Sequence, residues 1–383
     1  MFFSISKDSK DNFPHHYNFG NFIVNTDNGW KITIINNIQY LYKGYTDIGN
    51  IEDNLPQIIT ENFPTFLGNF CVIGNNKIVS DLYRSFPITY DNMEITNLKN
   101  VGHSIWCDNC VKFDDELNVT ETHNDVIGKI DSSTITEETA ISQIDRILSE
   151  KTIEFLKYNT KPLKVFLSGG VDSLLVYSYI QKYTKNYELI LNNHIDFDYF
   201  WLKNSNSIEN YWGYRQIHHW NNDCVLTSGA PGDEFMLRSP NTANIFCRYY
   251  NTSITKLLKE KQFVNCLHHN YFSLEKHTKL FKQHEIENLK FNNLEETIKF
   301  LCNINANDFQ HWHLGNTLTW TPLRDLEIFK ILLRLDFNTA SHQIMNSTIS
   351  KKLIERNNPN LIKLISDSKN HENYLSNLVY LLN

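Results

Sequence analysis

The chain leaves an apolar run, Val165–Leu167, through the sequence SGGVDS at residues 168–173. Glycines let a backbone approach a ligand closely, and the N–H groups that open a helix attract an anion. The hydroxyls of Ser168 and Ser173 add donors, so this loop predicts a phosphate cradle. A carboxylate beside phosphates repels them unless a cation lies between, so Asp172 predicts a bound Mg²⁺.

This loop differs from the common P-loop, because the G-x-x-x-x-G-K-[ST] pattern and its lysine are missing. A plain helix start is the competing interpretation, since Ser and Asp are frequent near helix N-termini and glycine makes the turn. The position directly after a buried strand favours nucleotide binding. The residues expected to line the nucleotide site here are Leu167, Ser168, Gly169, Gly170, Val171, Asp172 and Ser173.

The elements around this loop alternate between strands and helices. Residues 163–167, 187–193 and 223–228 have patterns typical of strands, and residues 173–185 have helical periodicity. Strands that alternate with helices predict βαβ units and a parallel sheet. Ligands of such sheets bind beyond the carboxyl ends of the strands, which is where SGGVDS lies.

A hydroxyl-rich stretch, DSSTITEETAIS at 131–142, divides the chain into two predicted domains. Residues 1–130 have mainly antiparallel β patterns and predict an α+β domain with little helix. Thr134 and Glu137 fit a capping box, and apolar residues follow them at helical spacing. Residues 131–383 therefore form the predicted α/β domain, which ends in a mostly helical part.

Length, charge and hydropathy exclude several classes of protein. At roughly 150 residues per domain, 383 residues favour two domains. A net charge of −7 argues against a protein whose main task is to grip a nucleic acid backbone. No apolar run approaches the roughly 20 residues of a membrane span, and no signal peptide pattern opens the chain, so a cytosolic protein is expected. Seven cysteines, an odd number, favour reduced thiols over a disulfide scaffold.

SGGVDS resembles the pyrophosphate-binding loop of the ATP pyrophosphatases, which split ATP between its α- and β-phosphates. A second stretch, TSGAPGDEFML at 227–237, is similar to the asparagine synthetase and β-lactam synthetase branch. This resemblance implies ATP and Mg²⁺ as cofactors, Gly232 as a nucleotide-binding residue and Asp233 as the second magnesium ligand. Without the first motif, Gly-Asp-Glu would indicate only a helix N-terminus with acids in its first turn.

Two later stretches are also similar to that branch. TWTPLRDLEIFKILLRL at 319–335 resembles its proline–loop–aspartate segment, with Pro322 and Asp325 matching. Residues 347–370 resemble a helix, a proline-containing turn and a second helix, followed by a lysine that steadies pyrophosphate and adenylate. Lys369 is the match, although a solvated lysine near the end of the chain is the competing interpretation.

The first domain resembles the glutaminase domain of the same family. LGNFCVIG (67–74) and DLYRSFPITY (81–90) are similar to two of its strands, which implies an Ntn-hydrolase-like antiparallel β sandwich. The second domain would then be adenine nucleotide α-hydrolase-like. Glutaminases of this type use a cysteine at position 2, whereas this chain begins Met1-Phe2-Phe3. A phenylalanine cannot attack an amide, so we expect a structural first domain without glutamine hydrolysis.

The family also places a glutamate before its proline–aspartate segment, close to the attacking amine. The matching position here is near Leu318, and no acid occurs between Asp308 and Asp325. His311 and His313 are the titratable groups of this stretch, so they are the candidate catalytic residues beside Lys369. Histidines that are merely polar or buried are commoner than catalytic ones, and the general base stays open.

Three functions remain at this point. The leading one is an AMP-forming ligase that joins a small-molecule carboxylate to an amine through an acyl-adenylate. The second is an ATP pyrophosphatase that modifies a nucleobase, and the third is a nucleotide-binding relic without chemistry. The substrates and the oligomeric state, including a homo-oligomer, stay open.

Overall fold

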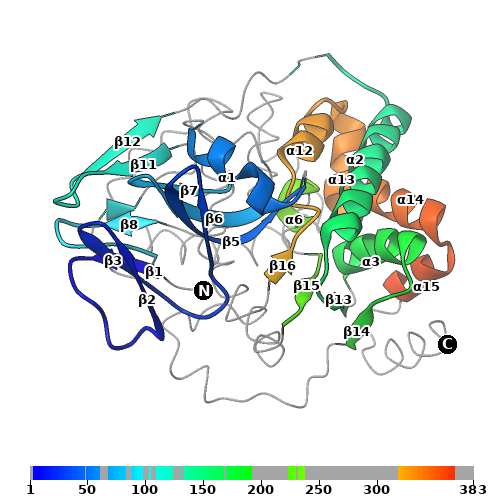
Figure 1. Ribbon diagram of the computed structural model, residues 1–383. Helices are drawn as coiled ribbons and strands as arrows, with labels where there is room; N and C mark the ends of the chain where they lie inside the picture. The colour runs from blue at the N-terminus through cyan, green and yellow to red at the C-terminus, as the bar shows by residue number, and fades with distance from the viewer. Residues whose placement is uncertain are drawn as a thin grey trace.

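The computed structural model describes residues 3–47, 49–60, 68–82, 88–97, 103–104, 109–123, 131, 133–167, 170–191, 223–229, 232–237 and 318–366. Antiparallel sheets occupy the N-terminal part of the chain, and a parallel sheet with helices follows (Figure 1). The protein is therefore of a mixed α/β class, as predicted.

Two antiparallel sheets contain the described strands up to His123. The first has the order β10-β8-β9-β1-β3-β2 and the second the order β12-β11-β7-β6-β5-β4. The strands of the first sheet are β1 (Phe3–Ser6), β2 (His15–Phe19), β3 (Phe22–Thr26), β8 (Thr89–Tyr90), β9 (Ile95–Thr96) and β10 (His103–Ser104). The strands of the second are β4 (Lys31–Ile35), β5 (Ile38–Thr46), β6 (Gly68–Gly74), β7 (Lys77–Ser80), β11 (Asn109–Phe113) and β12 (Val119–His123).

The two sheets enclose one apolar core, and α1 (Ile51–Thr60) covers the other face of the second sheet. Strand β6 shows how the sequence makes both layers. Its side chains alternate between faces, so Cys71 and Ile73 join the core between the sheets. Phe70 and Val72 join the core under α1, and every residue of the strand is buried.

A parallel sheet of four strands forms the second part of the chain, in the order β14-β13-β15-β16. Its strands are β13 (Leu163–Leu167), β14 (Glu188–Leu191), β15 (Val225–Thr227) and β16 (Leu318–Trp320). The predicted strand 163–167 is confirmed to the residue, because an apolar run interrupted only by Lys164 and followed by Ser-Gly-Gly is a local signal. The predicted helix over 173–185 is α3 (Val171–Tyr183), which begins two residues earlier.

Helices pack beside this sheet and on one another (Figure 1). They are α2 (Glu137–Tyr158), α3, α12 (Leu326–Leu333), α13 (Phe337–Asn346), α14 (Thr348–Asn357) and α15 (Asn360–Ser366). A short helix, α6 (Gly232–Phe235), follows β15. Among the residues that the structure describes, no helix is both long and apolar enough to cross a membrane.

The start of α2 corrects one expectation. The predicted capping box at Thr134 and Glu137 is wrong, because the N-cap is Thr136, whose Oγ1 accepts a hydrogen bond from Thr139 N at 3.2 Å. The preceding residue is held in an extended conformation, since Ile135 N donates to Arg334 O at 2.9 Å. A long-range backbone contact therefore decides where the helix begins.

This cap predicts a difference between two neighbouring threonines. Thr136→Ala should lower the free energy of unfolding by about 1 kcal/mol, the usual cost of losing an N-cap oxygen. Thr134→Ala, at an exposed position before the cap, should stay within about 0.5 kcal/mol of the original protein. Urea unfolding measures both, and an equal loss in the two variants would contradict the assignment.

Candidate functional site

Three loops of the parallel sheet meet at one edge. The chain passes from β13 into α3, from β15 into α6 and from β16 into α12. Because the four strands are parallel, their carboxyl ends lie on the same side, and the three loops lie there together.

The order of the strands places a switch point at this edge. The chain goes from β13 to β14 on one side, and β15 then lies on the other side of β13 (Figure 1). Connections that leave in opposite directions open a crevice outside the carboxyl ends of the two central strands, and ligands of open α/β sheets bind in that crevice. The SGGVDS loop follows β13 and the SGAPGDE loop follows β15, so the two motifs flank the switch point.

Two glycines let these loops touch. A methyl group on Gly229 would lie 2.2 Å from Ser173 N and 2.3 Å from the backbone carbon of Asp172. One on Gly232 would lie 2.6 Å from Asp172 Cγ and 2.8 Å from Leu323 Cδ1. No side chain fits at either position without displacing the loops. Sequence reasoning identified Gly232 but missed Gly229, although the two glycines of SGAPG are the signal.

The loop after β13 has a glycine at the helix start. Gly170 is the N-cap of α3 and supplies no side-chain hydrogen bond, while Ser173 Oγ donates to Gly170 O at 2.9 Å. Asp172 lies in the first turn, where the positive end of the helix dipole favours a negative charge. The Ser173 hydroxyl thus stabilises the turn itself.

The structure brings together the described members of the predicted site, and they differ in role. Leu167 and Val171 are 1% and 5% exposed and belong to the hydrophobic core, so only their backbones can face a ligand. Asp172 is partly exposed and contacts Gly232, the residue that opens α6. Asp233 follows within α6, and its side chain lies outside the description. The predicted site residues outside the described ranges are Ser168, Gly169, His311, His313 and Lys369.

The donor chemistry at this edge fits magnesium. Mg²⁺ prefers oxygen ligands and is usually held by one or two carboxylates together with substrate phosphates. Asp172 supplies a carboxylate beside the backbone that carries Asp233. The described side chains contain no cluster of three or more His, Cys, Asp or Glu residues that could hold a metal by themselves. A metal here would therefore depend on a ligand that brings its own oxygens.

The third loop, after β16, is held by buried charges. Asp325 is the N-cap of α12, and its Oδ1 accepts hydrogen bonds from Glu327 N at 2.7 Å and Ile328 N at 3.0 Å. Its Oδ2 lies 2.6 Å from Lys151 Nζ, which is also 2.9 Å from Asp47 Oδ2. Burial lowers the pKa of Lys151, but the carboxylates of Asp325 and Asp47 outweigh it, and the pKa is raised. The lysine is therefore charged.

Sequence reasoning found Asp325 but missed Lys151 and Asp47. Lysine on a long helix and aspartate near a turn are common at exposed positions, and nothing local distinguishes these two. Leu318, the position where the family has a glutamate, is the first residue of β16 and is half-buried.

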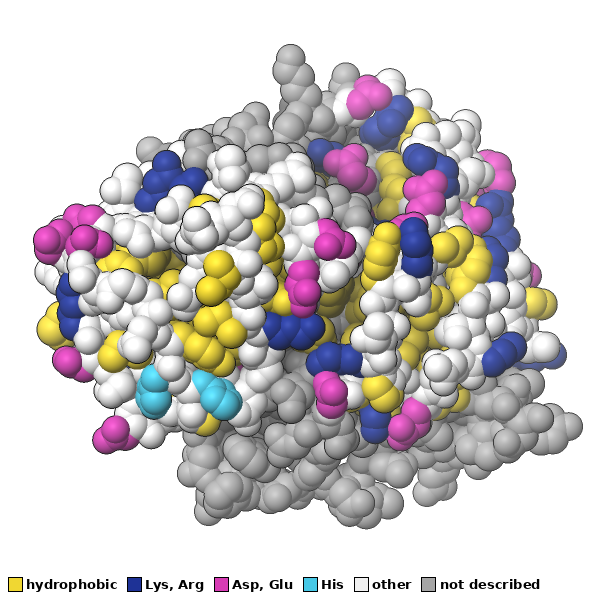
Figure 2. All heavy atoms as spheres, in the orientation of Figure 1, with side chains coloured by type: hydrophobic (Ala, Val, Ile, Leu, Met, Phe, Trp, Pro, Cys, Tyr) yellow, Lys and Arg dark blue, Asp and Glu magenta, His cyan; other side chains and the backbone are white. Residues whose placement is uncertain are grey.

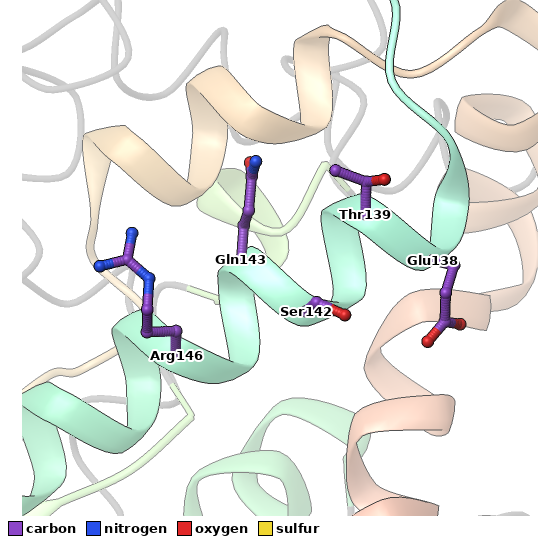
Figure 3. A pocket seen from close by; sticks show the side chains of 5 residues that line it. All are labelled: Glu138, Thr139, Ser142, Gln143 and Arg146. Carbon is purple, nitrogen blue, oxygen red and sulfur yellow. The ribbon is translucent and has the colours of Figure 1, made fainter.

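A separate hollow of about 390 Å³ lies along α2 (Figure 3). Its lining residues are Glu138, Thr139, Ser142, Gln143 and Arg146. All five belong to one helix, and Arg356 of α14 forms an ion pair with Glu138. None of them belongs to the three loops, so this hollow is not part of the candidate site.

Charges of both signs are interspersed on the face shown in Figure 2. Lys and Arg side chains lie among Asp and Glu side chains over the described elements. The described residues of this face therefore form no single basic surface for a nucleic acid backbone.

No protein-family model matches the chain, and neither does any curated protein.

The loop contacts predict a test by double-mutant cycle. Gly232→Ala and Leu323→Ala should be less destabilising together than the sum of the two, by about 0.5–3 kcal/mol, because truncating Leu323 removes one of the overlaps of the new methyl group, while the overlap with Asp172 remains. Gly229→Ala and Leu323→Ala should couple less strongly, since none of the three atoms nearest to Gly229 belongs to Leu323. Urea unfolding of the single and double variants checks this, and additivity at Gly232 would contradict the described contact.

Proposed function

We propose that this chain is an ATP-dependent ligase that forms an amide bond and releases AMP and pyrophosphate. The observation that carries the proposal is the contact between Asp172 and Gly232 at the switch point of the parallel sheet. It joins the two motifs that sequence reasoning connected to ATP, at the place where an α/β sheet binds ligands.

The finer fold assignment belongs to the same proposal. Two facing antiparallel sheets support an Ntn-hydrolase-like domain over residues 1–130. The parallel order β14-β13-β15-β16, with helices packed beside it, supports an adenine nucleotide α-hydrolase-like domain over residues 131–383. The first domain would then be structural, and the second would carry the chemistry.

Residues 168–173 would bind the β- and γ-phosphates through backbone N–H groups at the start of α3. Asp172 and Asp233 would hold magnesium, which offsets phosphate charge when it is bound. Asp172 is well placed for this, because the contact with Gly232 fixes its side chain toward the SGAPGDE loop. Close packing of the three loops would restrict the positions of the bound reactants. Holding reactants in line supplies much of the rate enhancement in phosphoryl transfer.

The reaction has two bond exchanges. A substrate carboxylate oxygen attacks the α-phosphorus, the bond between the α-phosphorus and the bridging oxygen breaks, and pyrophosphate leaves. The amine nitrogen then attacks the acyl carbon, AMP departs with the C–O electron pair, and the nitrogen loses a proton. His311 and His313 are our candidates to accept that proton, and Lys369 is our candidate to steady pyrophosphate.

The first exchange can be tested before the amine is known. With purified protein, Mg²⁺ and a panel of small carboxylic acids, labelled pyrophosphate should enter ATP, because adenylate formation is reversible. Asp172→Asn should reduce this exchange at least roughly a hundredfold, since a neutral amide holds Mg²⁺ poorly. Asp223→Asn is the matched control at the opposite end of β15, where Asp223 pairs with Lys161, and it should leave the exchange unchanged.

Formation of ADP and phosphate with an accepted carboxylate would overturn the proposed reaction. Full exchange in Asp172→Asn would overturn the role of that carboxylate. A shift of the protein's mobility with RNA at moderate salt, together with exchange that depends on RNA, would instead support nucleobase modification.

A further inference from the structure

The segment 319–325 is fastened to the antiparallel sheets. Asn69 of β6 donates from Nδ2 to Thr319 O at 2.6 Å and to Thr321 Oγ1 at 3.3 Å. Thr321 N donates to Tyr45 Oη, the tyrosine near the end of β5, at 3.2 Å. Three hydrogen bonds therefore join this segment to β5 and β6, so a displacement of the segment has to break them or move these strands.

Helix α2 holds the same segment from the other side. Trp320 stacks on Phe155 with ring centroids 4.1 Å apart and planes at 6°. One edge of Phe155 meets Tyr45, at a centroid distance of 5.8 Å. The end of β16 thus lies between β5 and β6 on one side and α2 on the other (Figure 1).

Buried charges complete this attachment. Lys151 Nζ lies between Asp47 Oδ2 and Asp325 Oδ2, and the three side chains are 10%, 10% and 2% exposed. Asp47 follows β5, Lys151 belongs to α2, and Asp325 caps α12. Removing Lys151 leaves two buried carboxylates without their cation, and removing Asp47 breaks the bond between α2 and the residue that follows β5. The cluster therefore couples the geometry of three elements.

The segment ends at the candidate site. Leu323, two residues before Asp325, is fully buried, and its Cδ1 lies 2.8 Å from the position of a methyl group on Gly232. That same position lies 2.6 Å from Asp172 Cγ. Leu323, Gly232 and Asp172 are thus in contact, so a displacement of the segment reaches the carboxylate through packed atoms.

We infer that Lys151 and Asp47 are positioning residues for the Asp172 loop: through Asp325 and Leu323, the antiparallel sheets hold the ATP site in its binding geometry. Neither residue is placed among the ligands of the nucleotide. The effect of these residues on nucleotide binding rests on the proposed function. The physical link from Asp47 to the Asp172 loop rests on the contacts alone.

The test measures amide hydrogen exchange without nucleotide and Mg·ATP affinity by calorimetry in the full chain. In Asp47→Asn and Lys151→Met, peptides that contain Asp172 or Gly232 should exchange roughly tenfold faster, because the link now opens locally. The dissociation constant for Mg·ATP should rise about tenfold, since only the well-formed fraction binds. Lys151→Arg keeps the charge between the two carboxylates and should restore both values toward those of the original protein.

Asp27→Asn is the matched control. Asp27 Oδ1 lies 3.7 Å from Nζ of Lys43, another buried lysine, and this pair lies within the antiparallel part of the chain. This variant should change neither exchange near Asp172 nor the affinity for Mg·ATP. Unchanged exchange in a folded Asp47→Asn variant would overturn the inference, and so would an equal effect in Asp27→Asn.

The two proposals fail separately. If the original protein does not bind Mg·ATP but Asp47→Asn still speeds exchange near Asp172, the link stands and the proposed function falls. If it binds Mg·ATP and Asp47→Asn alters neither measurement, the function stands and the link falls. Should Lys151→Met fail to fold, Asp47→Asn decides, because it leaves the Lys151–Asp325 pair intact.

Discussion

The absence of side chains at Gly229 and Gly232 is the constraint on which the candidate site depends. A side chain at either position would overlap the Asp172 loop. Because glycine has none, the loops after β13 and β15 can pack directly on each other. This close approach brings a carboxylate to the switch point of the sheet, where connections leave in opposite directions. A wider gap would leave Asp172 as an ordinary acid at a helix start, with only the helix dipole to favour it.

A second constraint comes from outside the parallel sheet. The loop after β16 closes on the site through Leu323, but it takes its position from β5, β6 and α2. Charged groups are rarely buried unless paired, and here one lysine satisfies two carboxylates from different parts of the chain. The antiparallel sheets therefore have a structural role: β5 and β6 hold the loop after β16 in place.

The features that sequence reasoning predicted are those with local causes. Strand β13 follows from an apolar run that ends just before two glycines. The start of α2 was missed because Ile135 is held by the backbone of Arg334, far along the chain. Lys151 was also missed because its partners are distant in sequence: the pattern of α2 gives no sign of the two acidic residues that it contacts.

Asp325 shows how these two constraints combine in one side chain. One of its oxygens caps α12, and the other forms an ion pair with Lys151. The start of α12 and the ion cluster that joins α2 to the end of β5 therefore share one carboxylate. A change at Asp325 would therefore break both together and could not distinguish them. Asp47 lies at the far end of the cluster and contributes to the link alone. Because the cap and the lysine pair survive its loss, Asp47 is the position at which the influence of the antiparallel sheets on the site can be separated from the stability of α12.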